Sequence, residues 1–271
     1  PALFCKEIDQ AHLTGQSKLS FKGIVSNVKD FFRDVKQTIN NKPFLRLCGA
    51  TFLVFNGYQV VASFAFYIVI FYLFNGNQMA AGQWPAWFGT VSALMTAFLV
   101  IPIITFMSTK IGKKNAFVVS TLISIVGYAL KWWGFSPGNP WFMFLPLPLM
   151  SFGIGGLFTL MMSMTADVCD YDELRNGMPR KEALFGAVYW WMVKLGMSLA
   201  LFLSGVILSA IGFDGNVQVQ THHTITMLRI ADISIPSIAG IIAIWIMWKY
   251  DITEARAREI RNTLVERRGE L

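Results

Sequence analysis

A single lysine lies in the middle of a long apolar stretch and is the clearest candidate for a functional residue in the sequence. Lys194 lies near the midpoint of the run from Glu182 to Gly212. A charge at that depth in a bilayer is costly unless it meets water, a partner or a substrate. Because its stem is too short to reach either interface easily, we expect Lys194 to face a polar cavity.

Aromatic and polar residues share the helical face of this lysine. Trp190, Trp191, Met197 and Ser198 lie three or four residues from Lys194. Indole rings stack on the apolar C–H patches of sugars, and an ammonium group binds sugar hydroxyls. The pattern favours a sugar site, although either tryptophan taken alone is explained as well by packing against lipid or a neighbouring helix.

A second polar stripe precedes this one in the chain. Asn56, Gln59, Ser63 and Tyr67 are separated by three, four and four residues, so a helix places them within a narrow arc. Amides and hydroxyls in such a stripe either join two membrane helices or line a path for a solute. The spacing leaves both interpretations open.

The elements that position these residues follow from composition. Of 271 residues, 54% are hydrophobic and only 14% are charged, which largely excludes a soluble enzyme. The apolar runs long enough to cross a bilayer are Phe44 to Phe74, Trp84 to Thr109, Asn115 to Phe135, Trp141 to Val168, Glu182 to Gly212 and Ile225 to Tyr250. None alternates as a barrel strand does, so the prediction is an all-α polytopic membrane protein with six transmembrane helices. We expect bends at Pro102, Pro146, Pro148 and Pro236.

The charges predict how the chain is oriented. Of its 23 Lys and Arg residues, 20 lie in four segments that six crossings place on one side, and this side is the cytoplasmic one. Both ends are then cytoplasmic: residues 1–43 form a loop with an amphipathic helix, residues 44–250 the bundle and residues 251–271 a tail. The net charge of +7 is explained by topology and by the anionic lipid surface, without a nucleic-acid partner.

Three further charges fall inside or near the ends of the apolar runs. Lys131, beside two tryptophans, is interpreted as an interfacial anchor, and Arg229 is expected to pair with Asp232 three residues later.

His222 and His223 lack a further ligand, so no metal site is predicted. No histidine lies within a span, and no nucleophile with its base is apparent, so we do not expect an enzyme.

The fourth and fifth runs, with the joint between them, carry a motif made of Ala166, Asp167, Asp170, Tyr171, Glu173, Gly177, Arg180, Glu182, Ala183, Lys194, Gly196, Gly205 and Ile211-Gly212-Phe213. This motif resembles the signature of the glycoside-pentoside-hexuronide:cation symporters (melibiose permease-like), a family of the major facilitator superfamily. Members have two six-helix halves, each a 3+3 inverted repeat. The chain is similar to the C-terminal half with the central loop, and because it opens at Pro1 we expect a fragment whose partner is the missing N-terminal half.

The resemblance implies uptake of a sugar or glycoside with sodium or a proton, by alternating access, in the plasma (bacterial inner) membrane. Lys194 matches a lysine near the sugar and cation sites, and Tyr189 and Trp190 match cavity positions. The coupling cation is expected mainly in the missing half, because no span here offers a carboxylate at mid-membrane; no other cofactor is expected. Lys194 would then pair with a carboxylate of that half, in competition with the cation. The alternative is a transporter of an amphiphilic or lipid-like substrate.

A cluster of charges lies at the cytoplasmic end of the fourth and fifth runs. Asp167, Asp170, Arg180 and Glu182 include both signs within 16 residues. Opposite charges on different helices can pair in one transport state and separate in the other, so we expect a conformational latch. The alternative, surface pairs on a solvated loop, is preferred for Asp172, Glu173 and Arg175.

Overall fold

The computed structural model describes residues 33, 35, 38–177 and 181–269, except the side chains of residues 268 and 269. The chain divides into a unit of residues 1–40 and a unit of residues 41–271. In the first unit residues 33, 35, 38 and 39 are helical, and most of the amphipathic helix expected within residues 1–43 lies outside the described residues.

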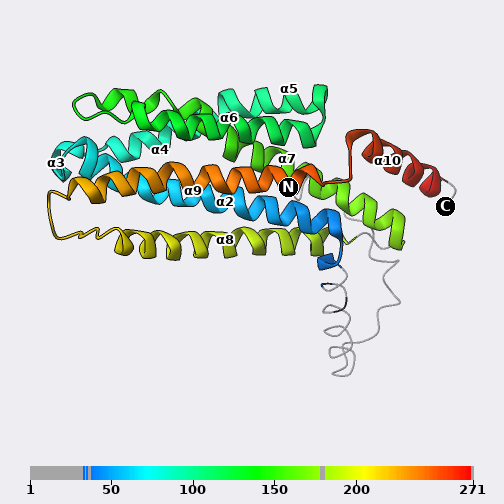
Figure 1. The fold of residues 1–271 in the computed structure, drawn as a ribbon. Coiled ribbons are helices and arrows are strands. Elements are labelled where there is room, and N and C mark those ends of the chain that lie inside the picture. Colours follow the sequence, from blue (N-terminus) through cyan, green and yellow to red (C-terminus); the bar gives the residue numbers. More distant parts are fainter. Residues whose placement is uncertain (1–32, 34, 36–37, 178–180, 270–271) are drawn as a thin grey trace, which may run out of the picture. The chain divides into compact units, whose positions relative to one another are not determined.

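The second unit is a bundle of helices (Figure 1). Its elements are α2 (Lys42–Tyr67), η2 (Ile68–Leu73), α3 (Gln78–Ala81), α4 (Trp84–Met95), η3 (Thr96–Val100), α5 (Ile101–Ile111), α6 (Lys113–Gly134), η4 (Pro140–Phe144), α7 (Leu147–Asn176), α8 (Glu182–Ala210), α9 (His222–Trp248) and α10 (Glu254–Gly269). Six continuous helical stretches among the described residues are long and apolar enough to cross a membrane. The predicted all-α architecture with six spans is confirmed.

The prolines act at helix starts more than as bends. Pro146 and Pro148 lie at the first turn of α7, where a missing N–H breaks no helical hydrogen bond, so the expected bends there are replaced by the helix start. Pro102 follows the π-helical turn η3, where the backbone hydrogen-bond pattern already departs from that of an α-helix. Pro236 lies inside α9 and faces α2.

The helix α2 is the centre of the bundle. It packs most extensively against α9 and α8, and it also contacts α7. In Figure 1 these three helices, α2, α8 and α9, lie side by side. The helix α6 packs against α7 and α9, and the α4–η3–α5 span lies against α6 and α7. This arrangement leaves much of α4, α5 and α8 uncovered.

Glycines allow the closest approaches between helices. A Cβ atom on Gly57 of α2 would lie 2.9 Å from the Cα atom of Pro236, and one on Gly127 of α6 would lie 2.5 Å from the backbone N of Met150. The Gly-rich start of α7, including Gly156, meets α6 in the same way. Small residues therefore set the helix spacing, as is usual in membrane bundles.

The charged side chains of α6 and α9 have partners other than those expected from the sequence. Lys131 is not an interfacial anchor: its side chain is 2% exposed, and its ammonium donates a hydrogen bond to Asp232. Arg229 interacts electrostatically with Asp232 but forms no direct ion pair with it. Its Nη2 donates to the carbonyl O of Trp132 at 2.5 Å, and its guanidinium lies 4.2 Å from the ring centres of Tyr72 and Trp132. Asp232 is also a carboxylate within one turn of the midpoint of α9, contrary to the expectation that no span offers one.

Candidate functional site

Lys194 lies on the uncovered face of α8. The opposite face of this helix packs into the bundle through Phe185, Tyr189, Val193 and Gly196. The Lys194 side chain is exposed, and no carboxylate within the described ranges forms an ion pair with it. Its ammonium is therefore open to a ligand or to another protein surface.

An aromatic row runs beside this lysine across three helices. Trp190, four residues before Lys194, stacks on Phe158 of α7, with ring centres 6.4 Å apart at 26°. Phe158 meets Phe55 of α2 edge to face at 6.0 Å. Trp190 is 43% exposed and Phe158 is 37% exposed, whereas Phe55 is buried. Trp190 and Phe158 thus present a partly open apolar surface one helical turn from the ammonium.

Phe158 was missed by the sequence reasoning. It lies in an apolar run of α7, and its spacing alone does not distinguish it from a core residue. Phe158 becomes a candidate only because its ring stacks on the indole of Trp190 in the folded chain. The only signal in the sequence was an aromatic residue close to the glycines of this run.

Two predicted aromatic residues point elsewhere. Tyr189 is fully buried, and its hydroxyl has no hydrogen-bond partner. Its ring meets Trp190 edge to face at 5.7 Å, so it supports that indole from inside the bundle. Trp191 is 62% exposed and lies 100° further around α8 than Trp190. Only Trp190 shares the row with Phe158.

The polar stripe of α2 joins two helices. The Nδ2 of Asn56 donates to the carbonyl O of Gly196 on α8 at 3.1 Å, so this buried amide binds α2 to α8 two residues beyond Lys194. Gln59 is partly buried, and its backbone carbonyl O accepts a hydrogen bond from the Ser63 hydroxyl at 3.0 Å. Tyr67 packs edge to face on Phe213 at 5.1 Å. Of the two open interpretations, the helix-joining role is observed for Asn56.

The predicted charge cluster lies at the end of the bundle where α7 meets α10. The helix α7 runs to Asn176, so Asp170, which was expected in the joint after Val168, lies in the same helix as Asp167. Asp167 accepts from Lys113 Nζ of α6 at 2.6 Å and lies 3.5 Å from Arg261 Nη2 of α10. Asp170 is buried and Glu182 is exposed, while Arg180 lies outside the described residues.

Lys113 and Arg261 were not among the predicted cluster residues. Both belong to basic segments that the sequence assigned to the same side of the membrane, which was the available signal. Neighbouring cations hold the end of α9: Lys114 Nζ donates to the carbonyl oxygens of Trp248 and Tyr250 at 2.8 and 2.9 Å. Positive charge at a helix C-terminus is favourable, and here it also ties α6 to α9.

Titratable groups do not gather elsewhere in a way typical of a metal centre. Among the residues that the structure describes, no three His, Cys, Asp or Glu side chains come close enough to hold a metal ion. The arrangement around Lys194 consists of one exposed ammonium, one stacked aromatic pair and an uncovered helix face. Residues 24–254 match the MFS/sugar transport protein family.

The chain belongs to this family. It is 28% identical over 221 residues to the glucuronide carrier protein homolog of Escherichia coli (strain K12), which covers 81% of this chain and 46% of that protein. It is 27% identical over 164 residues to the isoprimeverose transporter of Lactiplantibacillus pentosus, covering 60% of this chain and 34% of that protein. A putative sulfoquinovose importer of Escherichia coli (strain K12) is 25% identical over 231 residues, 84% of this chain and 47% of that protein.

These similarities define the class of the protein. The chain is a multi-pass membrane protein of a transporter family, and its relatives are transporters, not enzymes. The chain spans about half the length of the curated relatives it matches, or less. With six spans, it corresponds to one half of a major facilitator fold.

Proposed function

We propose that this chain is the C-terminal half of a secondary active transporter that carries a sugar or glycoside with a coupling cation, sodium or a proton, by alternating access. The observation that carries the proposal is the juxtaposition of Lys194 with the stacked pair Trp190 and Phe158 on an uncovered helix face. Stacked aromatic faces suit the apolar side of a sugar ring, and the ammonium suits its hydroxyls or an acidic substituent. The names of three relatives, which concern a glucuronide, isoprimeverose and sulfoquinovose, support the same substrate class.

The uncovered face is where the other six-helix half would lie. An ammonium at this depth is stable only beside water, a counter-ion or a ligand. Because no described carboxylate pairs with Lys194, a carboxylate of the other half or an acidic sugar is the proposed counter-ion. A cation that binds this carboxylate would compete with Lys194 and so couple its own binding to that of the sugar. Gln59 and Trp191 are proposed to complete the binding surface.

The charges around Asp167 are proposed to form a latch that closes in one transport state. Asp167 lies where α7 meets α6 and α10, and Asp170, Arg180 and Glu182 are proposed to act in the same latch, Arg180 lying outside the described residues. The pairs of Asp167 with Lys113 and Arg261 span three helices, so a movement of α7 against α6 or α10 would separate them. This end of the bundle is proposed to be cytoplasmic, because most of the basic residues lie there.

Uptake by the full-length protein in proteoliposomes tests the proposal. Labelled methyl β-D-glucuronide and methyl β-D-glucoside are supplied with an inward sodium gradient, with an inward proton gradient and with neither. We expect gradient-dependent accumulation of at least one of the two. Lys194→Gln should abolish accumulation, whereas the control Lys110→Gln, which removes an exposed lysine at the end of α5, should not. Wild-type levels of sugar binding and uptake in Lys194→Gln would refute the site.

Comparing the glucuronide with the glucoside also shows whether the Lys194 ammonium binds an acidic substituent of the sugar or pairs with a carboxylate of the other half. If Lys194 binds an acidic substituent, Lys194→Gln weakens glucuronide binding far more than glucoside binding. If it pairs with a carboxylate of the other half, both sugars lose coupling to the cation by a similar factor. Gradient-independent transport of a lipid-like amphiphile, with neither sugar carried, would favour the alternative substrate class.

A further inference from the structure

A small cavity lies beside the buried ion pair of α6 and α9. It has a volume of about 10 Å³ and is lined by Ile68, Lys131, Phe135, Arg229, Asp232 and Ile233. The side chains of Lys131 and Asp232 are only 2% exposed, whereas Arg229 and Ile233 are half-buried. A cavity of this volume corresponds to about one water molecule.

One carboxylate oxygen at this cavity needs a hydrogen-bond donor. Asp232 accepts from the Lys131 ammonium through Oδ2, whereas its Oδ1 is buried and has no hydrogen-bond partner within the described ranges. A buried charged oxygen that has lost its water and gained no donor is costly. Because the cavity borders the same side chain, a donor inside it would remove this cost.

Arg229 lines the cavity from one turn earlier on α9. Its guanidinium lies between the rings of Tyr72 and Trp132, 4.2 Å from each ring centre, and one of its five N–H groups donates to the carbonyl O of Trp132. It interacts electrostatically with Asp232 without a direct ion pair. Polar groups that face each other beyond hydrogen-bond reach are commonly bridged by water.

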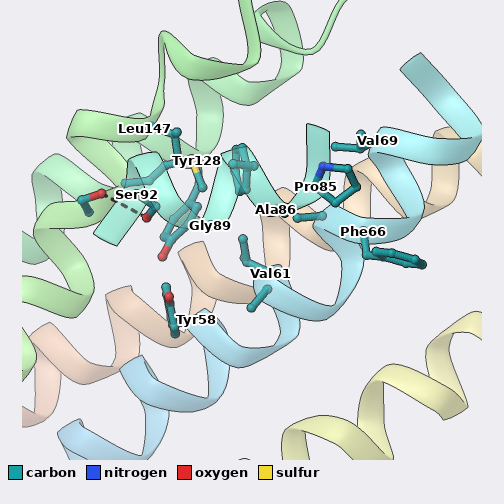
Figure 2. Close-up of a pocket in the computed structure, with 15 residues that line it drawn as sticks. Tyr58, Val61, Phe66, Val69, Pro85, Ala86, Gly89, Ser92, Tyr128 and Leu147 are labelled. Atoms are coloured by element: carbon teal, nitrogen blue, oxygen red, sulfur yellow. Dashed lines mark hydrogen bonds between the residues drawn. The ribbon is translucent and has the colours of Figure 1, made fainter. Parts of the chain in front are cut away.

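A hydroxyl near this pair faces a different space. Tyr128, one turn before Lys131 on α6, lines a groove of about 380 Å³ between α2 and α4. In Figure 2 its hydroxyl points toward that of Tyr58, with Ser92 beside them. The groove is polar at this end and apolar at the other, where Phe66 lies. Tyr128 does not line the cavity beside Asp232, so its hydroxyl is not the missing donor.

We propose that the small cavity binds one ordered water molecule, which donates a hydrogen bond to Asp232 Oδ1 and accepts one from Arg229. The pairing of Arg229 with Asp232 that their spacing suggests is then made through water. The carboxylate is shared between Lys131 of α6 and Arg229 of α9. The inference is independent of the proposed transport function, because all of these groups belong to this bundle.

The charges around the cavity favour water over an ion. Two cations, Lys131 and Arg229, face one carboxylate, so a sodium ion would be repelled by the net positive charge. A chloride ion would lie against Asp232 Oδ1 as a like charge and would leave this oxygen without a donor. Water both donates and accepts, and the three side chains supply the polar partners that a buried water requires.

Hydroxyl-radical footprinting of the purified full-length protein tests for this water. X-ray radiolysis of a bound water oxidises the side chains next to it, even where bulk solvent does not reach. Phe135 lines the cavity and is 2% exposed, with its ring centre 5.0 Å from Lys131 Nζ. The internal reference is Phe117 of α6, which is fully buried and outside the cavity lining. We expect Phe135 to be oxidised severalfold faster than Phe117.

A pair of matched variants links the oxidation to the cavity. Ile233→Phe adds volume at the cavity wall, and Ile230→Phe adds the same volume at an exposed position of α9 outside the lining. Ile233→Phe should lower the oxidation rate of Phe135 to that of Phe117, and Ile230→Phe should leave it at the wild-type rate. Equal rates for the two phenylalanines in the wild type, or a Phe135 rate that Ile233→Phe does not lower, would overturn the proposal.

Stability measurements separate the loss of water from steric strain. Displacing the water leaves Asp232 Oδ1 without a donor, so Ile233→Phe should raise the unfolding equilibrium constant about tenfold. In a protein that also carries Lys131→Met and Asp232→Leu there is no carboxylate, and the same substitution should change this constant by no more than about twofold. An equal loss in both backgrounds would indicate strain alone and exclude the bridging water.

Discussion

The ammonium of Lys131 on α6 donates a hydrogen bond to the carboxylate of Asp232 on α9, and both side chains are only 2% exposed. The second oxygen of Asp232, Oδ1, is buried without a hydrogen-bond partner. This ion pair joins α6 to α9 in addition to the hydrogen bonds from Lys114 to Trp248 and from Arg229 to Trp132. Its position in α9 identifies Asp232 as a structural carboxylate of this bundle.

Removing one member of the pair should be worse than removing both. Lys131→Met or Asp232→Leu alone leaves an uncompensated buried charge, and we expect each to lower the free energy of unfolding by about 3–5 kcal/mol. The double variant should recover most of this loss, because similar-sized apolar side chains then fill the site. Thermal unfolding of the detergent-solubilised full-length protein measures the difference.

The matched control for this cycle is the exposed pair of α10. Arg258 and Glu254 lie 3.4 Å apart on successive turns, with the arginine side chain 68% exposed. Arg258→Ala should change stability by no more than about 0.5 kcal/mol. A double variant of Lys131 and Asp232 that is no more stable than its single variants would contradict the structural role.

The hydrogen bond from Asn56 to Gly196 predicts a smaller effect on stability and a larger one on binding. Asn56→Ala should cost about 1 kcal/mol, the usual range for one interhelical hydrogen bond in a membrane. Because α8 would be held less firmly at the level of Lys194, glycoside affinity should fall more than stability does. Asn115→Ala, which removes an amide that donates to the backbone carbonyl of Ile111 at the end of α5, is the control for both measurements.

Phe158 and Trp190 should behave as one unit in sugar binding. Each ring stacks on the other, so Phe158→Ala and Trp190→Ala should both weaken methyl glycoside binding, and the double variant should lose less than the two effects combined. Titration of the labelled sugar gives the three affinities. Trp245→Ala, at an exposed position on α9, controls for the general loss of an aromatic residue. Fully additive losses would argue against a shared sugar surface.

The charge network around Asp167 predicts how firmly α10 is held. Asp167→Asn should weaken its pairs with Lys113 and Arg261 and release α10 from α7, since Arg261 belongs to α10. Hydrogen exchange of the α10 amides reports this as reduced protection. Arg261→Ala should reduce protection of the same amides, because it removes the α10 member of this pair, while burial of Ala257, Ile260 and Leu264 limits the loss in both variants. Unchanged protection in Asp167→Asn would mean that apolar packing alone docks this helix.

Sequence reasoning succeeded where a property is local. The six spans follow from runs of apolar residues, because a bilayer requires each span to satisfy its own backbone hydrogen bonds. The family membership followed from a motif within one contiguous region of the chain. The prolines were recognised as ladder-breaking residues, but whether each bends a helix or begins one depends on where the helix starts.

The pairing of charges could not be read from spacing. Arg229 and Asp232 are three residues apart and appear matched, yet the carboxylate meets Lys131, which is 101 residues away in the chain. Likewise Asp167 meets Lys113 and Arg261 from two other helices. Side-chain partners in a bundle are chosen by helix packing, and packing depends on contacts that are distant in sequence.

The sequence by itself determined the number of spans, the class of protein and the isolated charge of Lys194, because hydrophobicity and motif are properties of contiguous residues. Only the tertiary structure decided that Phe158 lies under Trp190, that Tyr189 is turned into the core, and that a groove with one polar end opens between α2 and α4. Each of these depends on how one helix is rotated against another, and that rotation is set by the close approach of small residues across the whole bundle.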